Sequence, residues 1–321
     1  MPKGYKHLTY KQRCQIFVLI ERGDSSPKIA VMIGVNRSTV SREIKRNRGK
    51  YGYHSEQAHE KAQNRRAHSP NKKMTSQMIT NIEEKIKLDW SPVQISGRLK
   101  KQGEEHVSYE TIYKHIKRDK KNGGILYTHL RHRGKKYNKR SNGFSGRGYI
   151  PDRIDIEQRP AIVEEKSRLG DWELDTIIGA NHKRAIVSIV DRASKFTKLV
   201  KVSRKTSEEV SQAIISALDP VRSFVLSLTA DNGKEFAGHR RVSSELQSEF
   251  YFATPYHSWE RGLNEHTNGL VRQYFPKGKN FDDISKSDVE EVESFLNNRP
   301  RKILGFETPT EAFNRLASAA K

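Results

Sequence analysis

The sequence predicts a protein of several domains, with all-α units in its N-terminal part and an α/β domain with a mixed five-stranded sheet in its C-terminal part. Apolar residues recur at helical spacing as far as about residue 130, whereas short β-rich runs alternate with helical segments from Leu169 onward. The charge also changes along the chain. Residues 1–150 contain 34 Lys and Arg against 12 Asp and Glu, an excess of +22, while residues 151–321 contain 26 of each. A chain of 321 residues has room for two or three domains.

The uneven charge narrows the range of partners. A strongly basic half suggests a polyanion, because neutralised phosphates release their counterions. A membrane surface would also attract it, but no basic segment carries a continuous apolar face, so we expect no membrane partner. The single cysteine, Cys14, excludes an intramolecular disulfide and a cysteine-based zinc cluster. Since no N-terminal stretch has the form of a signal peptide, we expect a cytoplasmic protein.

Residues 1–68 form the first predicted domain, a helix-turn-helix unit that binds DNA. The capping-box pattern of residues 9–12 starts one helix, and a second helix covers residues 27–33. Asn36 can cap a third helix, at residues 37–47. The outward positions of this third helix carry donors that suit the major groove: Arg37, Thr39, Ser41, Arg42, Lys45 and Arg46. The alternative is an ordinary helical bundle with a solvated basic face.

Residues 69–130 form the second predicted domain, which resembles another helix-turn-helix unit. Residues 51–73 are polar and are interpreted as a helix end followed by a linker. The pattern Ser91-Pro92-x-Gln94 combines an N-cap, a proline at the first helical position and a capping-box partner. Ser108 then starts a helix at residues 109–117. A plain helical spacer is the alternative. The candidate DNA contacts of this domain are Tyr109, Thr111 and Lys114.

Residues 131–164 form a predicted basic linker. No acidic residue occurs between 131 and 150, and the stretch shows no periodicity. Such a segment is either a merely solvated connection or one that follows the DNA backbone. Under the second interpretation its candidate DNA contacts are Arg131, Arg133, Lys135 and Lys136.

Residues 165–321 form the predicted α/β domain. Strands are expected at residues 172–179, 185–190, 196–202, 224–229 and 249–253. Helices are expected at residues 207–218, 242–246, 258–274, 288–298 and 308–316. A strand, a hairpin, and then alternating helices and strands follow one another in the order of an RNase H-like domain.

Three carboxylates of this domain can converge on one point. Asp175 lies within a strand, Asp231 lies at the exit of a strand expected beside it, and Glu265 follows on the next long helix. Carboxylate oxygens are hard ligands that suit Mg²⁺, and two such ions about 3.5–4 Å apart can clamp a phosphate during in-line displacement. The sequence therefore predicts a metal-dependent phosphoryl-transfer site.

Each of these residues also has an alternative. Asp171 and Glu173 alternate with Asp175 on one strand face, so any of the three could be the ligand. The sequence after Asp231 is a common turn signal, and Glu260 can simply complement a helix dipole. Three histidines are expected to be surface or structural residues: His182, His257 and His266.

Together these motifs resemble the DDE transposases of the insertion-sequence-thirty family, found in bacterial insertion sequences, over nearly the whole chain. The matching segments are residues 38–47, 172–175, 229–236, 259–270, 274–278 and 296–302. The resemblance implies a retroviral integrase-like fold and assigns catalysis and metal binding to Asp175, Asp231 and Glu265. It also implies two Mg²⁺ ions, with Mn²⁺ as a substitute. The candidate DNA contacts near this site are Arg261 and Arg272. One departure is His266, where the family more often has asparagine.

The resemblance further implies the reaction. Water attacks a phosphodiester at the end of the element and frees a 3′-hydroxyl, which attacks target DNA without a covalent enzyme intermediate. The partners would be the terminal inverted repeats, target DNA and further copies of the chain on the DNA ends, at the nucleoid. Two other classes remain open, namely a repressor that only binds DNA and an RNase H-like nuclease that cleaves without joining.

Overall fold

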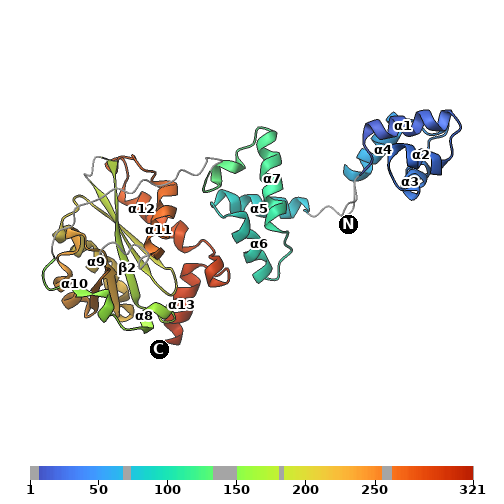
Figure 1. Cartoon of the computed structure of the whole chain (residues 1–321). Coiled ribbons are helices and arrows are strands. Elements are labelled where there is room, and N and C mark those ends of the chain that lie inside the picture. The colour runs from blue at the N-terminus through green and yellow to red at the C-terminus, as the bar shows by residue number, and fades with distance from the viewer. Residues whose placement is uncertain (1–6, 68–73, 133–149, 181–183, 255–261, 321) are drawn as a thin grey trace. The chain divides into compact units, whose positions relative to one another are not determined.

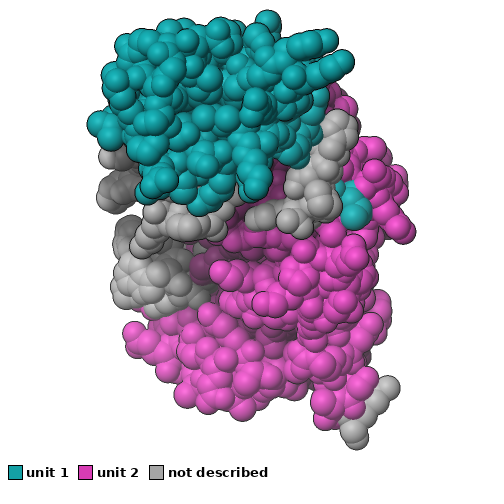
Figure 2. All heavy atoms as spheres, turned by 90° about the vertical axis from the view of Figure 1, so that its right-hand side faces the viewer, with its two compact units in different colours: residues 1–75 teal, residues 76–321 magenta. Residues whose placement is uncertain are grey.

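The computed structural model describes residues 7–67, 74–132, 150–180, 184–254 and 262–320. The chain divides into two compact units, Met1–Thr75 and Ser76–Lys321 (Figure 2). The second helical unit and the α/β domain fall within the same compact unit. The boundaries proposed above at residues 68, 130 and 164 therefore remain predictions.

Unit 1 is helical, as predicted. Its helices are α1 (Tyr10–Glu21), α2 (Ser26–Ile33), α3 (Arg37–Asn47) and α4 (Ser55–Ala67). The side chain of Thr9 accepts from the backbone of Gln12, and the side chain of Gln12 accepts in turn from Thr9, which completes the predicted capping box. Gly34 ends α2 with φ of +67°, a left-handed conformation that favours glycine. Asn36 caps α3.

Helix α4 extends well beyond the helix end that the sequence predicted. Its length could not be predicted from an apolar pattern, because Ala58 is the one buried residue among its described side chains. Ala58 packs in a core with Ile16 and Val40. Lys61 and Arg65 also donate to backbone carbonyls at the end of α3, so tertiary contacts rather than an apolar stripe hold the helix.

Unit 2 begins with three helices and a short 3-10 helix: α5 (Ser76–Lys87), α6 (Pro92–Lys101), α7 (Tyr109–Lys121) and η1 (Leu126–His129). The capping box of Ser91 and Gln94 forms as predicted. Helix α6 contacts the C-terminal segment of the chain. Arg98 forms an ion pair of 2.5 Å with Glu311, and the ring of Phe306 lies so close to Gly97 that a Cβ there would meet it at 2.2 Å.

In the described part of unit 2 the sheet is mixed and has six strands. They are β1 (Ile154–Asp155), β2 (Asp171–Ile178), β3 (Ala185–Asp191), β4 (Thr197–Val202), β5 (Ser227–Ala230) and β6 (Glu249–Phe252), in the order β1-β6-β5-β2-β3-β4. The first four in this order are parallel, and β2, β3 and β4 pair antiparallel. The prediction of five strands was wrong. The two residues of β1 lie within the predicted linker and are too few to show any alternation.

Helices cover both faces of the sheet (Figure 1). They are α8 (Ile162–Glu165), α9 (Ser207–Leu218), α10 (His239–Leu246), α11 (Gly262–Tyr274), α12 (Lys286–Asn297) and α13 (Pro309–Ala319). On one face, Leu174 of β2 packs in a core with residues of α9 and α10. On the other face, Ile177 packs in a core with residues of α11 and α12. Because side chains alternate along a strand, Glu173 and Asp175 share the second face with Ile177 and lie beneath α11.

Candidate functional site

Asp175 and Asp231 lie at the same level of two adjacent strands. The parallel register of β2 and β5 pairs Glu173 with Thr229. Two residues further along each strand come Asp175 and Asp231, and both are half-buried. The register of the sheet thus brings Asp175 and Asp231 to corresponding positions, with Asp231 directly after the end of β5.

Neutral donors hold the carboxylate of Asp175. The amide nitrogen of Thr176 donates to Oδ1 at 2.8 Å, and Nδ2 of Asn268 donates to Oδ2 at 2.7 Å. The hydroxyl of Ser188, which lies opposite Asp175 in the register of β2 and β3, donates to Oδ1 of Asn268 at 2.8 Å. This second bond fixes which way the amide of Asn268 points. The result is a carboxylate with a defined orientation.

The turn that carries Asp231 is tied to its neighbours. Oδ1 of Asp231 accepts from the amide of Gly233 at 2.9 Å, so the residue forms the turn that its sequence indicated. The next side chain, Asn232, donates to the carbonyl of Ala253 at 2.7 Å and accepts from Arg153 at 2.7 Å. The turn is therefore anchored to the end of β6 and to the segment before β1.

Glu265 lies in the first turn of α11 and is exposed. Asn268 and Arg272 follow it at spacings of three and seven residues, which places all three on one flank of the helix. This flank follows β2, because Asn268 contacts Asp175 and NH2 of Arg272 donates to the carbonyl of Ile178 at 2.7 Å. Nevertheless, in the described part of the chain no three His, Cys, Asp or Glu side chains are close enough to hold a metal ion. The third carboxylate shares the flank without closing the cluster.

The two other acids on the same face of β2 are paired with arginines. Oε1 of Glu173 lies 2.7 Å from NH1 of Arg192, and both side chains are 2% exposed. Asp171 is buried and lies 2.8 Å from Nε of Arg168. Burial raises the pKa of Glu173, and the charge of Arg192 acts in the opposite direction. The geometry thus distinguishes Asp175 from the two neighbours that the sequence pattern could not separate.

Glu235, which falls within the matching segment 229–236, lies next to the candidate site. Its side chain is 7% exposed and forms an ion pair of 2.7 Å with Lys205. It also accepts from the hydroxyl of Thr176 at 3.0 Å, directly beside Asp175. No periodicity could have indicated this contact, because Lys205 and Thr176 come from separate strands and loops.

The candidate recognition helix of unit 1 presents a basic surface. Thr39 is half-buried, and the other outward candidates are exposed: Arg37, Ser41, Arg42, Lys45 and Arg46. On its inner side Val40 is fully buried, and Glu43 forms an ion pair of 2.6 Å with Arg13 of α1. The helix is therefore held from within while its outer positions remain accessible.

The remaining candidate DNA contacts differ in their surroundings. Tyr109, Lys114 and Arg131 are exposed, and Thr111 is half-buried. Arg272 is half-buried with its guanidinium engaged by carbonyl groups, and burial lowers its pKa. Several residues named from the sequence lie outside the described residues: Arg133, Lys135, Lys136, His182, His257, Glu260 and Arg261.

Known proteins resemble this chain over nearly its whole length. A family described as a helix-turn-helix domain matches residues 4–47. The transposase for insertion sequence element IS4351 of Bacteroides fragilis is 46% identical over 314 residues, which is 97% of this chain and 96% of that protein. The transposase InsI for insertion sequence element IS30A of Escherichia coli (strain K12) is 34% identical over 328 residues, 98% and 85% of the two chains. This chain belongs to the IS30 family of transposases.

As a member of the IS30 family, the chain is a DDE-type enzyme of DNA transposition with a helix-turn-helix for binding DNA. Among solved structures, the catalytic core domain of BIV integrase is similar to 47% of this chain, with 21% identity and a TM-score of 0.37 over 97% of that domain. None of the helices in the described ranges is long and apolar enough to cross a membrane.

Transposases and integrases generally use divalent metal ions. The residues of this IS30-family member fit such an ion in their chemistry, because Asp175 and Asp231 offer hard carboxylate oxygens at one level of adjacent strands. The hydrogen bonds made to these carboxylates fit a metal ion as well. A metal-binding carboxylate is normally oriented by further hydrogen bonds, and Asn268 supplies one to Asp175.

Proposed function

We propose that this IS30-family chain is the transposase of a bacterial insertion sequence, which binds the terminal inverted repeats of its element and cuts and joins DNA strands at Asp175, Asp231 and Glu265. The observation that carries the proposal is the level placement of Asp175 and Asp231 on adjacent strands, beneath a helix flank that also bears Glu265. A repressor that only binds DNA would have no need of this arrangement.

The protein groups at this site have separable roles. Asn268 and Thr176 hold the carboxylate of Asp175 in one orientation, and the turn at Gly233 holds that of Asp231. Glu265, in the first turn of α11, would complete the set of carboxylate ligands. When bound, Mg²⁺ would activate the attacking oxygen and stabilise the charge on the leaving oxygen. We infer two such ions, with Mn²⁺ as a substitute, because a single ion would serve only one of these two oxygens.

DNA binding is assigned to the exposed basic positions. Residues 1–75 carry 17 Lys and Arg against 5 Asp and Glu, and the outer face of α3 displays four of these cations. We assign base contacts in the major groove to α3 and further contacts with DNA to the outer face of α7. Two DNA ends and a target must meet during transposition, which favours a homo-oligomer assembled on DNA at the nucleoid.

The test uses the full chain, a DNA fragment with the element's own ends, Mg²⁺ and a plasmid target. We expect a freed 3′-hydroxyl at the element's end, followed by joined products, and loss of both with Asp231→Asn. Binding to the ends without any Mg²⁺-dependent cleavage would identify a repressor. Cleavage that never leads to joining would identify a nuclease.

A further inference from the structure

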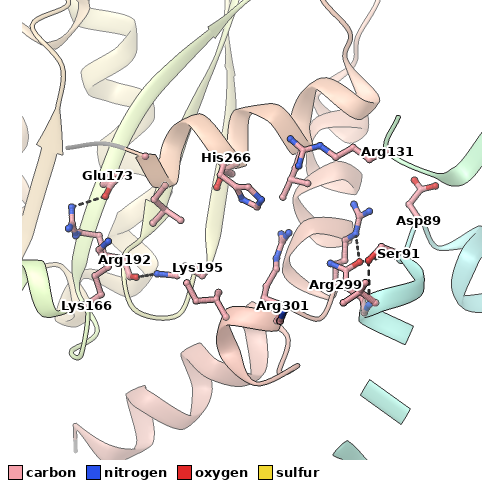
Figure 3. Close-up of a pocket in the computed structure, with 18 of the residues that line it drawn as sticks. Asp89, Ser91, Arg131, Lys166, Glu173, Arg192, Lys195, His266, Arg299 and Arg301 are labelled. Atoms are coloured by element: carbon pink, nitrogen blue, oxygen red, sulfur yellow. Dashed lines mark hydrogen bonds and ion pairs between the residues drawn. The ribbon is translucent and has the colours of Figure 1, made fainter. Parts of the chain in front are cut away.

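A cavity of about 1010 Å³ lies beside α11 (Figure 3). It is lined by the flank of α11 that carries His266, and not by Asn268, which contacts Asp175. Two helices and one connecting segment of unit 2 contribute much of its lining. Helix α11 contributes His266, Thr267 and Leu270, the start of α6 contributes Gln94, and the segment after α12 contributes Arg299, Arg301 and Ile303. Glu173 and Arg192 also line it, so the cavity shares strand β2 with the catalytic candidate Asp175.

Among the described residues, two arginines of this cavity are buried without a carboxylate at ion-pair distance. Arg299 is 3% exposed and Arg301 is 8% exposed, and Asp89 acts on Arg299 through its charge without forming an ion pair with it. Arg299 donates to the neutral side chains of Gln94 and Gln273 at 3.2 and 3.4 Å. NH2 of Arg301 donates to the carbonyl of Leu296 at 2.9 Å, while its Nε has no partner. Burying a cation without a counter-charge is costly, so these residues favour an anionic ligand.

The lining of the cavity as a whole carries more positive than negative side chains. Seven of the lining residues are Lys or Arg, and three are Asp or Glu: Arg131, Lys166, Arg192, Lys195, Arg299, Arg301 and Lys302 against Asp89, Glu164 and Glu173. Glu164 and Glu173 are already paired with Arg192. Asp89 lies 3.0 Å from Nδ1 of His129. The carboxylates of the cavity therefore leave most of its positive charge uncompensated.

The cations also act on one another. Figure 3 shows the guanidinium groups of Arg131, Arg299 and Arg301 pointing toward the space beside His266. Burial, followed by the charge of Arg299, lowers the pKa of Arg301 to about 10. Partial desolvation and the charges of these three arginines lower the pKa of His266. Burial and the charge of Lys166 lower the pKa of Lys195 to about 8. These shifts arise first from burial and second from repulsion between neighbouring cations.

We propose that this cavity binds a backbone phosphate of a DNA strand at Arg299 and Arg301, as a site separate from the three carboxylates. This proposal rests on the proposed function, which supplies the DNA. A guanidinium matches a phosphate through paired N–H groups. The volume is that of a pocket for a small ligand, which suits one nucleotide of a single strand, and the apolar side chains of Val93, Leu263 and Ile303 can contact its sugar or base.

The first experiment tests for the anion site in the full chain. The melting temperature of the full chain is measured in a few millimolar inorganic phosphate and in chloride of equal ionic strength. At this concentration phosphate has no general salt effect on folding, so a difference reports binding. We expect phosphate to raise the melting temperature of unit 2 by about 3 °C, and Arg301→Gln to lose this rise. Lys195→Gln serves if Arg301→Gln does not fold. Lys286→Gln alters an exposed residue of α12 outside the cavity and should keep the rise in melting temperature. No rise in the unmodified chain would overturn the site.

The second experiment identifies the source of the phosphate. Binding of a labelled single-stranded oligonucleotide of mixed sequence is measured by fluorescence anisotropy, and we expect Arg301→Gln to weaken it about tenfold relative to Lys286→Gln. Equal binding by both variants would overturn the DNA assignment and leave a site for free phosphate. Neither measurement requires strand joining. Asp231→Asn should therefore keep the phosphate effect even though it loses catalysis, which separates a failure of this site from a failure of the proposed function.

Discussion

Glu173 and Asp175 occupy the same face of the same strand, two residues apart, yet their surroundings differ completely. Glu173 is 1% exposed and its charge is matched by Arg192. Asp175 is half-buried and accepts from the neutral groups of Thr176 and Asn268. A carboxylate whose charge is already neutralised by arginine is a poor ligand for a cation. The comparison teaches that strand alternation collects acids on a face, whereas their tertiary partners decide which one can bind metal.

The largest effect on strand joining is expected from substitution of Asp175. Asp175→Asn keeps the shape of the side chain but removes its charge, and a neutral amide is a poor ligand for Mg²⁺. We expect strand joining to fall at least about a thousandfold, because metal-ion stabilisation amounts to several kcal/mol. Asp231→Asn and Glu265→Gln should behave alike, and binding to the element's ends should persist. Joining assays and gel-shift assays on the same preparations check this, and retained joining with Glu265→Gln would exclude that residue from the site.

Glu173→Gln should affect stability rather than chemistry. Among the described residues, the change leaves the buried guanidinium of Arg192 with Glu164 as its one carboxylate partner. Breaking one side of a buried ion pair costs about 3 kcal/mol, which corresponds to a fall of roughly 6–10 °C in melting temperature. Strand joining measured well below that temperature should remain detectable. A variant that unfolded normally but joined no ends would reverse the roles given to Glu173 and Asp175.

Asn268 offers a finer test of what holds Asp175. Asn268→Ala removes the donor to Oδ2 without touching any charge. Loss of an outer contact to a metal ligand typically costs about 10–100-fold in metal affinity or activity, so we expect a higher Mg²⁺ concentration for half-maximal joining. Ser188→Ala, which frees the amide to rotate and removes a weaker contact of 3.3 Å with the carbonyl of Asp175, should have a smaller effect of the same kind. Unchanged Mg²⁺ dependence in both variants would show that this hydrogen-bond chain does not orient Asp175.

The smallest effect is expected on stability and concerns Glu311, which is paired with an arginine like Glu173 but is exposed. The hydrogen bond from Arg98 holds the pKa of Glu311 at about 2, below its ordinary value of 4.5. A carboxyl whose pKa is lowered on folding adds stability above pH 4.5, and this stability is lost as the pH falls toward 2. Since the side chain is 42% exposed, screening limits the effect to less than about 1 kcal/mol. The difference in melting temperature between the unmodified chain and Glu311→Gln should therefore shrink from pH 6 to pH 3. A constant difference would contradict the pairing.

Local signals in the sequence located most elements of the fold. The capping boxes at Thr9, Ser91 and Thr308 all form, because each needs only residues three apart. Strand β5 begins three residues later than expected, since Asp219–Phe224 forms the 3-10 helix η4. The full length of α4, the short helix α8 and strand β1 were not predicted, because they depend on contacts with distant elements rather than on periodicity.

The candidate site was predictable in its position but not in its contacts. The family resemblance assigned the catalytic carboxylates, and the structure places Asp175 and Asp231 at one level of the sheet. No pattern in the sequence could pair Glu173 with Arg192, nor bring Arg299 and Arg301 together in one cavity. Those relationships arise only when β2, β3 and the segment after α12 pack around α11.

The attachment of α6 to the C-terminal segment has a consequence for where DNA would be cut. The ring of Phe306 packs against Gly97, and Arg98 forms an ion pair with Glu311. These contacts attach α6, and with it the neighbouring α7, to the segment that carries α13. If α7 lies on DNA, the number of base pairs between its footprint and the carboxylates is dictated by protein dimensions, not by the flexibility of the duplex. Cleavage should then fall at one invariant nucleotide, and loosening this joint should scatter the cuts over several.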